Sequence, residues 1–120
     1  MPDATTKACV LLAEDEMMVA MMLEDRLEHF GYQVLKAARL TACLALAESA
    51  AIDVAILDIN LAGEVSFPVA EVLRRRGIPF VFSSGYGDDG LPAAWKGEKV
   101  LQKPYDTHQL ISMLNGLRNA

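Results

Sequence analysis

Polar residues that could do chemistry follow four apolar runs of this sequence. Asp58 follows one run, and the others lead into Glu14 and Asp15, Ser84 and Lys103. If these runs are parallel strands, their carboxyl ends bring three carboxylates, a hydroxyl group and an ammonium group to the edge of a sheet where open α/β folds bind ligands. Three neighbouring carboxylates repel one another unless a cation lies among them, so the set predicts a divalent metal. The lysine and the serine suit a phosphoryl group that is attached to, or arrives at, one of the acids.

The elements that must position these residues alternate between strand and helix patterns along the whole chain. Apolar runs predict strands at residues 8–13, 32–37, 54–57, 79–82 and 99–102. The second run is rather polar and is expected at a sheet edge. Helical periodicity predicts helices at residues 16–30, 41–51, 68–76 and 107–118. The fourth crossover, residues 85–92, holds three glycines and a proline, which leaves room for only a turn or two of helix at residues 93–96.

Five short strands separated by helices favour an α/β fold, with a parallel doubly wound sheet and helices on both of its faces. The 120 residues suffice for a single domain, 1–120, with its core at about residues 7–118. A net charge of −5 argues against a nucleic-acid-binding face, and no stretch approaches the ~20 apolar residues that span a membrane. The two cysteines lack metal-ligand spacing and are expected to be buried free thiols of a cytoplasmic protein.

Other conspicuous side chains have structural explanations. The expected buried stripe of the first helix is formed by Val19, Leu23, Leu27 and Phe30. The same helix carries four methionines, Met17, Met18, Met21 and Met22. They are expected to fill the core and to supply adaptable surface, with a partner-docking face as the alternative. Trp95 is expected to anchor the short fourth helix, and the arginine run at 74–76 to complement the dipole of the third helix.

Four short segments resemble the receiver domain of two-component response regulators, and the resemblance runs over nearly the whole chain. They are Leu-Leu-Ala-Glu-Asp-Glu at 11–16, Leu-Asp-Ile-Asn-Leu at 57–61, Phe-Ser-Ser-Gly at 82–85 and Gln-Lys-Pro-Tyr at 102–105. Each segment alone is a weak signal, but the four occur in the family's order and each lies at a predicted strand end. The resemblance implies the flavodoxin-like strand order 2-1-3-4-5 and a cis peptide bond between Lys103 and Pro104.

The resemblance implies that Asp58 accepts a phosphoryl group from a phosphohistidine, on a histidine kinase or a histidine phosphotransfer protein. Mg²⁺ is the implied cofactor, because two anions, the acceptor carboxylate and the phosphoryl donor, must approach each other. Its ligands would be the carboxylates of Asp15 and Asp58 and, directly or through water, Glu14. Asn60 would add its backbone carbonyl, so its side chain is expected to matter less.

Two further residues of the site would hold the phosphoryl group. Lys103 would pair with the phosphoryl oxygens as a mobile charge, and Ser84 would hydrogen-bond the group once it is in place. The chain departs from the family at Val100, where receivers usually carry a Tyr or Phe that rotates on activation. The readout is therefore expected in the crossover at residues 85–96, which phosphorylation should order. The segment from Pro79 to Gly87 resembles a subgroup of alphaproteobacterial single-domain receivers with the motif Phe-Ala-Thr-Gly-x-Tyr. Ser83 and Ser84 stand where that motif has Ala and Thr.

We expect a stand-alone receiver without an output domain, which is not an enzyme and signals through protein contacts or drains phosphoryl groups from a kinase. A phosphatase of the haloacid dehalogenase type would need a second acid two residues after the nucleophile, where this chain has Asn60. A binding module with the same fold but without phosphorylation is the alternative. Such a module would be expected to lack one of the site residues, and this chain has them all.

Overall fold

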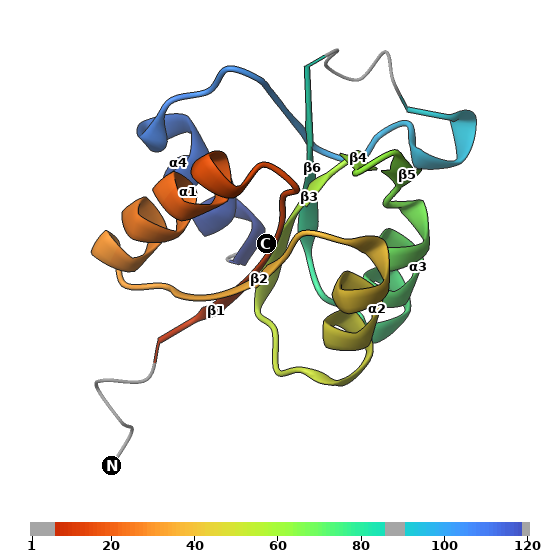
Figure 1. Ribbon diagram of the computed structural model, residues 1–120, viewed down its shortest axis with the longest axis horizontal. Helices are drawn as coiled ribbons and strands as arrows, with labels where there is room; N and C mark the ends of the chain where they lie inside the picture. The colour runs from red at the N-terminus through yellow and green to blue at the C-terminus, as the bar shows by residue number, and fades with distance from the viewer. Residues whose placement is uncertain (1–6, 86–90, 119–120) are drawn as a thin grey trace.

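The central sheet is built from five parallel strands (Figure 1). The computed structural model describes residues 7–85 and 91–118, and the strands of its sheet are β1 (Cys9–Ala13), β2 (Gln33–Ala37), β3 (Val54–Asp58), β6 (Phe80–Ser84) and β7 (Val100–Gln102). They lie in the order β2-β1-β3-β6-β7, with β2 at one edge. When only the five strands of this sheet are numbered in chain order, β6 and β7 become the fourth and fifth strands, and the order is 2-1-3-4-5. The predicted doubly wound topology is therefore confirmed.

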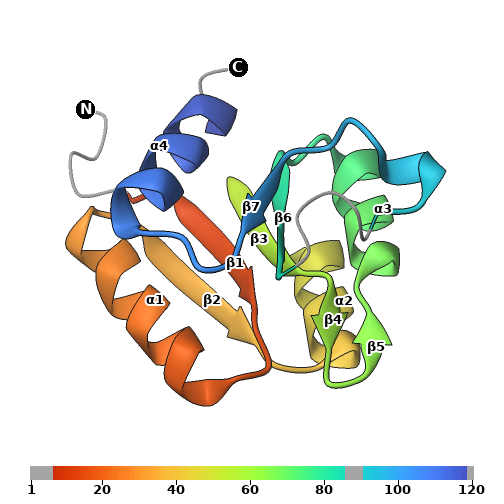
Figure 2. The ribbon, with the colours of Figure 1, turned by 90° about the horizontal axis from the view of Figure 1, so that it is seen from above.

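Four α-helices cover the two faces of the sheet, α1 and α4 on one face and α2 and α3 on the other (Figure 2). They are α1 (Met17–His29), α2 (Leu40–Ser49), α3 (Phe67–Arg76) and α4 (Thr107–Arg118). Strand residues alternate between two cores: in β1, Val10 and Leu12 pack with α1 and α4, whereas Leu11 and Ala13 pack with α2 and α3. Burial on both faces explains why the strands read as continuous apolar runs. None of the described helices is long and apolar enough to cross a membrane.

The first helix buries a stripe that differs in part from the predicted one. Leu23 and Leu27 are buried as expected, but Phe30 is 47% exposed and Ala20 is buried. The prediction for Phe30 is wrong because the helix ends at His29 and Phe30 is its C-cap residue. A side chain at that position no longer follows the helical stripe. The buried stripe of α1 therefore runs from Ala20 to Leu27 and ends before the cap.

Trp95 anchors the described part of the fourth crossover to the core. It ends a single 3₁₀ turn, η2 (Ala93–Trp95), and is only 5% exposed. Its ring stacks on Phe67 with centroids 5.8 Å apart, and it meets Phe80 and Phe82 edge-on. Edge-on and offset contacts of this kind suit the charge distribution of aromatic rings. The expected packing anchor and the single short helical turn are both confirmed.

The arginines at the end of α3 contact specific partners. Arg76 donates a hydrogen bond from Nη1 to the carbonyl oxygen of Ala47 at 2.6 Å. This carbonyl group belongs to the last turn of α2, which lies beside α3 (Figure 2) and whose last carbonyl groups have no partner within the helix. Arg74 places its guanidinium group 4.0 Å from the centroid of the Trp95 ring. Beyond the predicted interaction with the helix dipole, these arginines therefore join α3 to α2 and to the fourth crossover.

An antiparallel hairpin, which the sequence patterns did not predict, connects β3 with α3. Its strands are β4 (Asn60–Leu61) and β5 (Glu64–Val65). The two turn residues, Ala62 and Gly63, have φ angles of 52° and 89°, both positive as in a type I′ hairpin turn. Alanine rarely adopts such an angle, so Ala-Gly is a weaker hairpin signal than Asn-Gly. The sequence of this segment therefore reads as a loop.

Candidate functional site

The carboxyl ends of the strands place the chemically competent residues at one edge of the sheet. Glu14 and Asp15 directly follow β1, and Asp58 is the last residue of β3. The Lys103 N–H, just beyond β7, donates to the carbonyl oxygen of Ser84 at 2.8 Å. This bond continues the pairing of β6 with β7 past the strand ends. The structure thus brings together residues that are up to 89 positions apart in the sequence.

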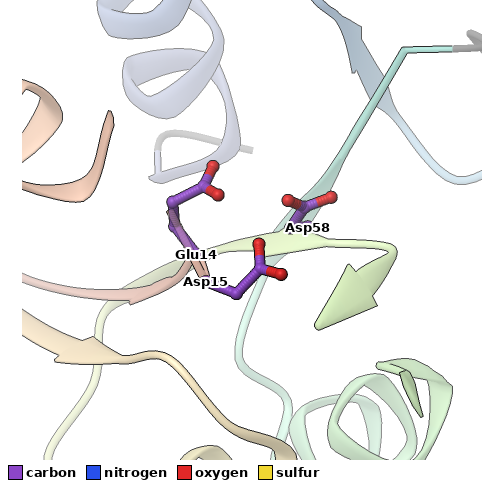
Figure 3. A group of neighbouring side chains, drawn as sticks. All are labelled: Glu14, Asp15 and Asp58. Atoms are coloured by element: carbon purple, nitrogen blue, oxygen red, sulfur yellow. The ribbon is translucent and has the colours of Figure 1, made fainter. Parts of the chain in front are cut away.

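Three carboxylates form an acid cluster at this edge (Figure 3). Glu14, Asp15 and Asp58 each offer one oxygen, and these oxygens lie within 4.8 Å of one another. Glu14 and Asp58 are 4% and 9% exposed, whereas Asp15 is exposed. Several oxygen donors at such spacing are what hard divalent cations prefer. The cluster could hold such a cation, which would relieve the repulsion among the three acids.

Lys103 reaches the acid cluster and pairs with two of its members. Its Nζ lies 3.0 Å from Asp58 Oδ2 and 3.3 Å from Glu14 Oε1. Burial alone would lower the pKa of Lys103, but the hydrogen bond to Asp58 and the charges of Asp58 and Glu14 outweigh it, so the pKa is raised. Lys103 therefore stays charged at neutral pH. One ammonium group cannot balance three carboxylates, so the cluster still favours a further cation.

Glu14 carries the most deeply buried carboxylate of the acid cluster. Burial raises its pKa above the usual value for glutamate. The Glu16 N–H, which donates to Glu14 Oε2 at 3.1 Å, and the charge of Lys103 oppose this shift only in part. Glu14 therefore takes up a proton at a higher pH than an exposed glutamate does. The cluster therefore loses the charge of Glu14 at a higher pH than it would if that carboxylate were exposed.

The β4–β5 hairpin contacts the acid cluster through Asp15. The Ala62 N–H donates a hydrogen bond to Asp15 Oδ2 at 2.9 Å. Asn60 turns its side chain into the hairpin, where its Oδ1 accepts a hydrogen bond from the Gly63 N–H at 2.8 Å. A metal ligand from Asn60 would therefore be its backbone carbonyl, which is the group that the resemblance to receivers implied. The hairpin itself is a part of the site that sequence reasoning missed.

Residues of β6, of β7 and of the loop after β7 complete this edge. Ser84 is buried at the end of β6, and Val100 is half-buried against the core. The peptide bond between Lys103 and Pro104 is cis, as the resemblance implied. Tyr105, to which sequence reasoning gave no role, is half-buried, and burial raises the pKa of its phenol.

Residues 86–90 lie outside the described part of the chain. They include Tyr86 and Gly87, the last two residues of the segment that resembles the motif Phe-Ala-Thr-Gly-x-Tyr. Membership of that subgroup and the expected ordering of residues 85–96 on phosphorylation therefore stay predictions. Near the C-terminal end of residues 85–96, Trp95 is buried in the core and anchors the crossover.

Four methionines form an exposed methionine face on the first two turns of α1. Met17 and Met18 are 74% and 81% exposed, and Met21 and Met22 are 53% and 43% exposed. The expectation that they fill the core is wrong, because α1 buries its leucines against the sheet instead. Contiguous apolar side chains at a surface mark interaction sites more often than single ones do. Their exposure instead favours the predicted adaptable surface, or the alternative to it, a face that docks a partner protein.

A family model matches most of the chain. It is the model of the response regulator receiver domain, and it matches residues 10–115. The matched span includes every member of the acid cluster, Lys103 and the whole β4–β5 hairpin.

Relatives of known structure have the same fold. The chain is 39% identical to SdrG from Sphingomonas melonis Fr1, whose solution structure matches with a TM-score of 0.79 over 96% of this chain and 98% of that one. It is 21% identical to the receiver domain of the sensor histidine kinase PA1611 from Pseudomonas aeruginosa PAO1. That structure, with magnesium coordinated in its active site cleft, matches with a TM-score of 0.83 over 96% of this chain and 100% of that one.

A relative among curated proteins is longer than this chain. The transcriptional regulatory protein YbdJ of Bacillus subtilis strain 168 is 26% identical over 112 residues, which make up 90% of this chain. The chain spans about half of that relative, 49% of its length. The likeness therefore concerns one part of that protein.

Proposed function

The chain belongs to the response regulator receiver domain family, and on that premise we propose that it accepts a phosphoryl group on Asp58 from a phosphohistidine of a histidine kinase or histidine phosphotransfer protein. The observation that carries the proposal is the environment of Asp58. Its carboxylate lies at the sheet edge beside two further acids and 3.0 Å from the ammonium group of Lys103. Three neighbouring acids that share one ammonium group leave negative charge for a cation to balance, and this grouping matches the needs of phosphoryl transfer.

In the proposed reaction an oxygen of Asp58 attacks phosphorus, the bond from phosphorus to the histidine nitrogen breaks, and an aspartyl phosphate forms. Lys103 is already in contact with the acceptor carboxylate, so a short side-chain movement would pair it with the new phosphoryl oxygens. Ser84, at the end of the neighbouring strand, would donate a hydrogen bond to the group. Lys103 and Ser84 would orient the phosphoryl group, and Lys103 would neutralise part of its charge. Orientation and charge neutralisation are most of what phosphoryl transfer requires of a protein.

Mg²⁺ is the proposed cofactor. The donor set fits it, because the three members of the acid cluster offer carboxylate oxygens. The backbone carbonyl of Asn60 is proposed as a further ligand. When bound, the ion would reduce the repulsion between the acceptor and the incoming phosphoryl group. Glu14, Asp15 and Asp58 would hold it, with Glu14 acting directly or through water.

Phosphoryl transfer to Asp58 is proposed to occur in the cytoplasm, where the free cysteines Cys9 and Cys43 stay reduced.

Phosphorylation of the wild-type chain tests the proposal. Incubation with acetyl phosphate and Mg²⁺, and in parallel with a panel of autophosphorylated histidine kinases, should add one phosphoryl group to the intact mass. A chelator should prevent the addition. A chain that stays unmodified by every donor, yet still binds a partner protein, would favour the alternative of a binding module with a receiver fold.

Cation binding is expected to weaken as the pH falls, because burial raises the pKa of Glu14. A carboxyl group with a raised pKa takes up its proton earlier on acidification, so the cluster loses one negative charge while exposed acids are still ionised. Calorimetric titration with Mg²⁺ between about pH 5 and 8 measures the effect. In Glu14→Gln the affinity should be lower at neutral pH and should vary less over the same range. An equally steep pH dependence in both proteins would contradict the assignment to Glu14.

The methionine face is expected to contact the protein that donates the phosphoryl group. Met17 lines the same surface pocket as Glu14 and Asp15, so a donor that reaches the acid cluster also covers the start of α1. Exchanging an exposed anchor for a charge, Met18→Glu, should slow transfer from a cognate kinase by about fivefold or more. Transfer from acetyl phosphate, which needs no docking, should not change.

Phe30→Glu supplies the matched control for this prediction. Phe30 is also exposed and lies at the other end of α1. A charge introduced there should leave both reactions unchanged. Equal losses in the two variants, or a loss with acetyl phosphate, would show that the methionine face does not dock the donor.

A further inference from the structure

The β4–β5 hairpin links the acid cluster to the segment that follows Asp58. Asn60 opens the hairpin, and its Oδ1 accepts a hydrogen bond from the Gly63 N–H at 2.8 Å. The preceding amide of the turn, that of Ala62, donates to Asp15 Oδ2 at 2.9 Å. Two consecutive N–H groups of one turn therefore bond to two different side chains. One of these side chains lies in the hairpin itself, and the other belongs to the acid cluster.

The turn needs this internal support. Ala62 has a φ of 52°, an angle at which a side chain with a Cβ atom is held at a cost in free energy. Two residue pairs join β4 to β5, and the Ser66 N–H donates one further bond to the carbonyl oxygen of Ile59 at 2.8 Å. So short a ladder is a weak restraint. The Gly63 N–H bond to Asn60 closes the turn from within, as asparagine side chains do in other turns. Without it, Ala62 would relax toward a negative φ and its N–H would turn away from Asp15.

Asp15 depends on that N–H for its orientation. It is the exposed member of the acid cluster, so its side chain is free to rotate unless something holds it. The bond to Ala62 occupies one lone pair of Oδ2. The other carboxylate oxygen, and the remaining lone pair, stay available to a cation. Loss of a group that orients a metal ligand in this way typically lowers metal affinity by roughly 10- to 100-fold.

We propose that the Asn60 side chain is a positioning residue of the metal site, and that it acts through the turn of the hairpin on the Asp15 carboxylate. The proposal rests on the proposed Mg²⁺ site. It reverses the expectation that the Asn60 side chain matters less than its backbone carbonyl. The side chain needs no contact with the ion, because its effect passes through the amides of Gly63 and Ala62.

Mg²⁺ affinity, measured by calorimetry on the full chain without a phosphoryl donor, tests the proposal. Asn60→Ala should weaken Mg²⁺ binding about tenfold. In an Asp15→Ala background the same change should have no further effect, because its target is already gone. Adding Ala62→Asn to Asn60→Ala should restore affinity to near the wild-type value, since Asn-Gly forms a type I′ turn unaided. In the metal-free protein, the amide signal of Ala62 should shift in Asn60→Ala and return in the rescued variant.

The outcomes separate this proposal from the proposed function. If the wild-type chain binds no Mg²⁺, the metal assignment itself is wrong, and the positioning role falls with it. If the wild type binds Mg²⁺ and Asn60→Ala binds it equally well, only the role of Asn60 is overturned. A tenfold loss that persists in the Asp15→Ala background, or that Ala62→Asn does not rescue, would likewise overturn the proposed route through the turn.

Discussion

Replacing Asp58 with asparagine is expected to abolish phosphorylation of the chain by acetyl phosphate and by histidine kinases. The introduced amide would keep the size of the side chain, but it is a poor nucleophile toward phosphorus and lacks the charge that holds Lys103 at 3.0 Å. The substitution also removes one of the three acids proposed to bind Mg²⁺. The intact mass after incubation with Mg²⁺ and donor should therefore stay that of the unmodified protein.

Asp53→Asn is the matched control for this loss. Asp53 lies at the opposite end of the same strand, where its Oδ2 accepts a hydrogen bond from the Cys9 N–H at 2.7 Å. An asparagine oxygen can accept that bond equally, so the control should fold and should be phosphorylated as the wild type is. Addition of a phosphoryl group to Asp58→Asn would show that the acceptor is another residue, and its position would then follow from peptide mapping.

Replacing Trp95 with alanine is expected to lower the free energy of unfolding by about 3–5 kcal/mol, the range for large aromatic residues removed from a core. The indole ring is only 5% exposed and contacts three phenylalanines and the Arg74 guanidinium group. A cavity in that aromatic cluster would also release the end of the fourth crossover from the sheet. Urea unfolding followed by far-ultraviolet circular dichroism measures the change, because the signal does not depend on the chain's one tryptophan.

Phe30→Ala serves as the control for aromatic loss alone. Phe30 is 47% exposed at the end of α1, so its removal should change the free energy of unfolding by only about 0.5 kcal/mol. A cost of less than about 1 kcal/mol for Trp95→Ala would show that the fourth crossover is not anchored through this ring. In that case the response to phosphorylation expected of residues 85–96 would have to start from another contact.

The sequence alone determined the layout of the fold and which residues could do chemistry. Strands buried on both faces need apolar residues at every position, so they stand out as runs that end in polar residues. Parallel strands bring those ends to one edge, and this rule by itself predicts that Glu14, Asp15, Asp58 and Lys103 lie together. The pattern reports local burial, which is why most element boundaries are confirmed. The strand order, which the resemblance to receivers implied, is confirmed as well.

Only the tertiary structure decided how side chains from distant segments meet. The pairing of Lys103 with both Glu14 and Asp58, the exposure of the methionine face and the bond from Ala62 to Asp15 have no local signature. Periodicity identified Leu23 and Leu27 as buried, but it did not show that the apolar methionines of α1 lie outside the core. A hairpin built on Ala-Gly resembles a loop. Each of these features depends on packing between elements that are far apart in the chain, and packing is a property of the assembled fold rather than of any one segment.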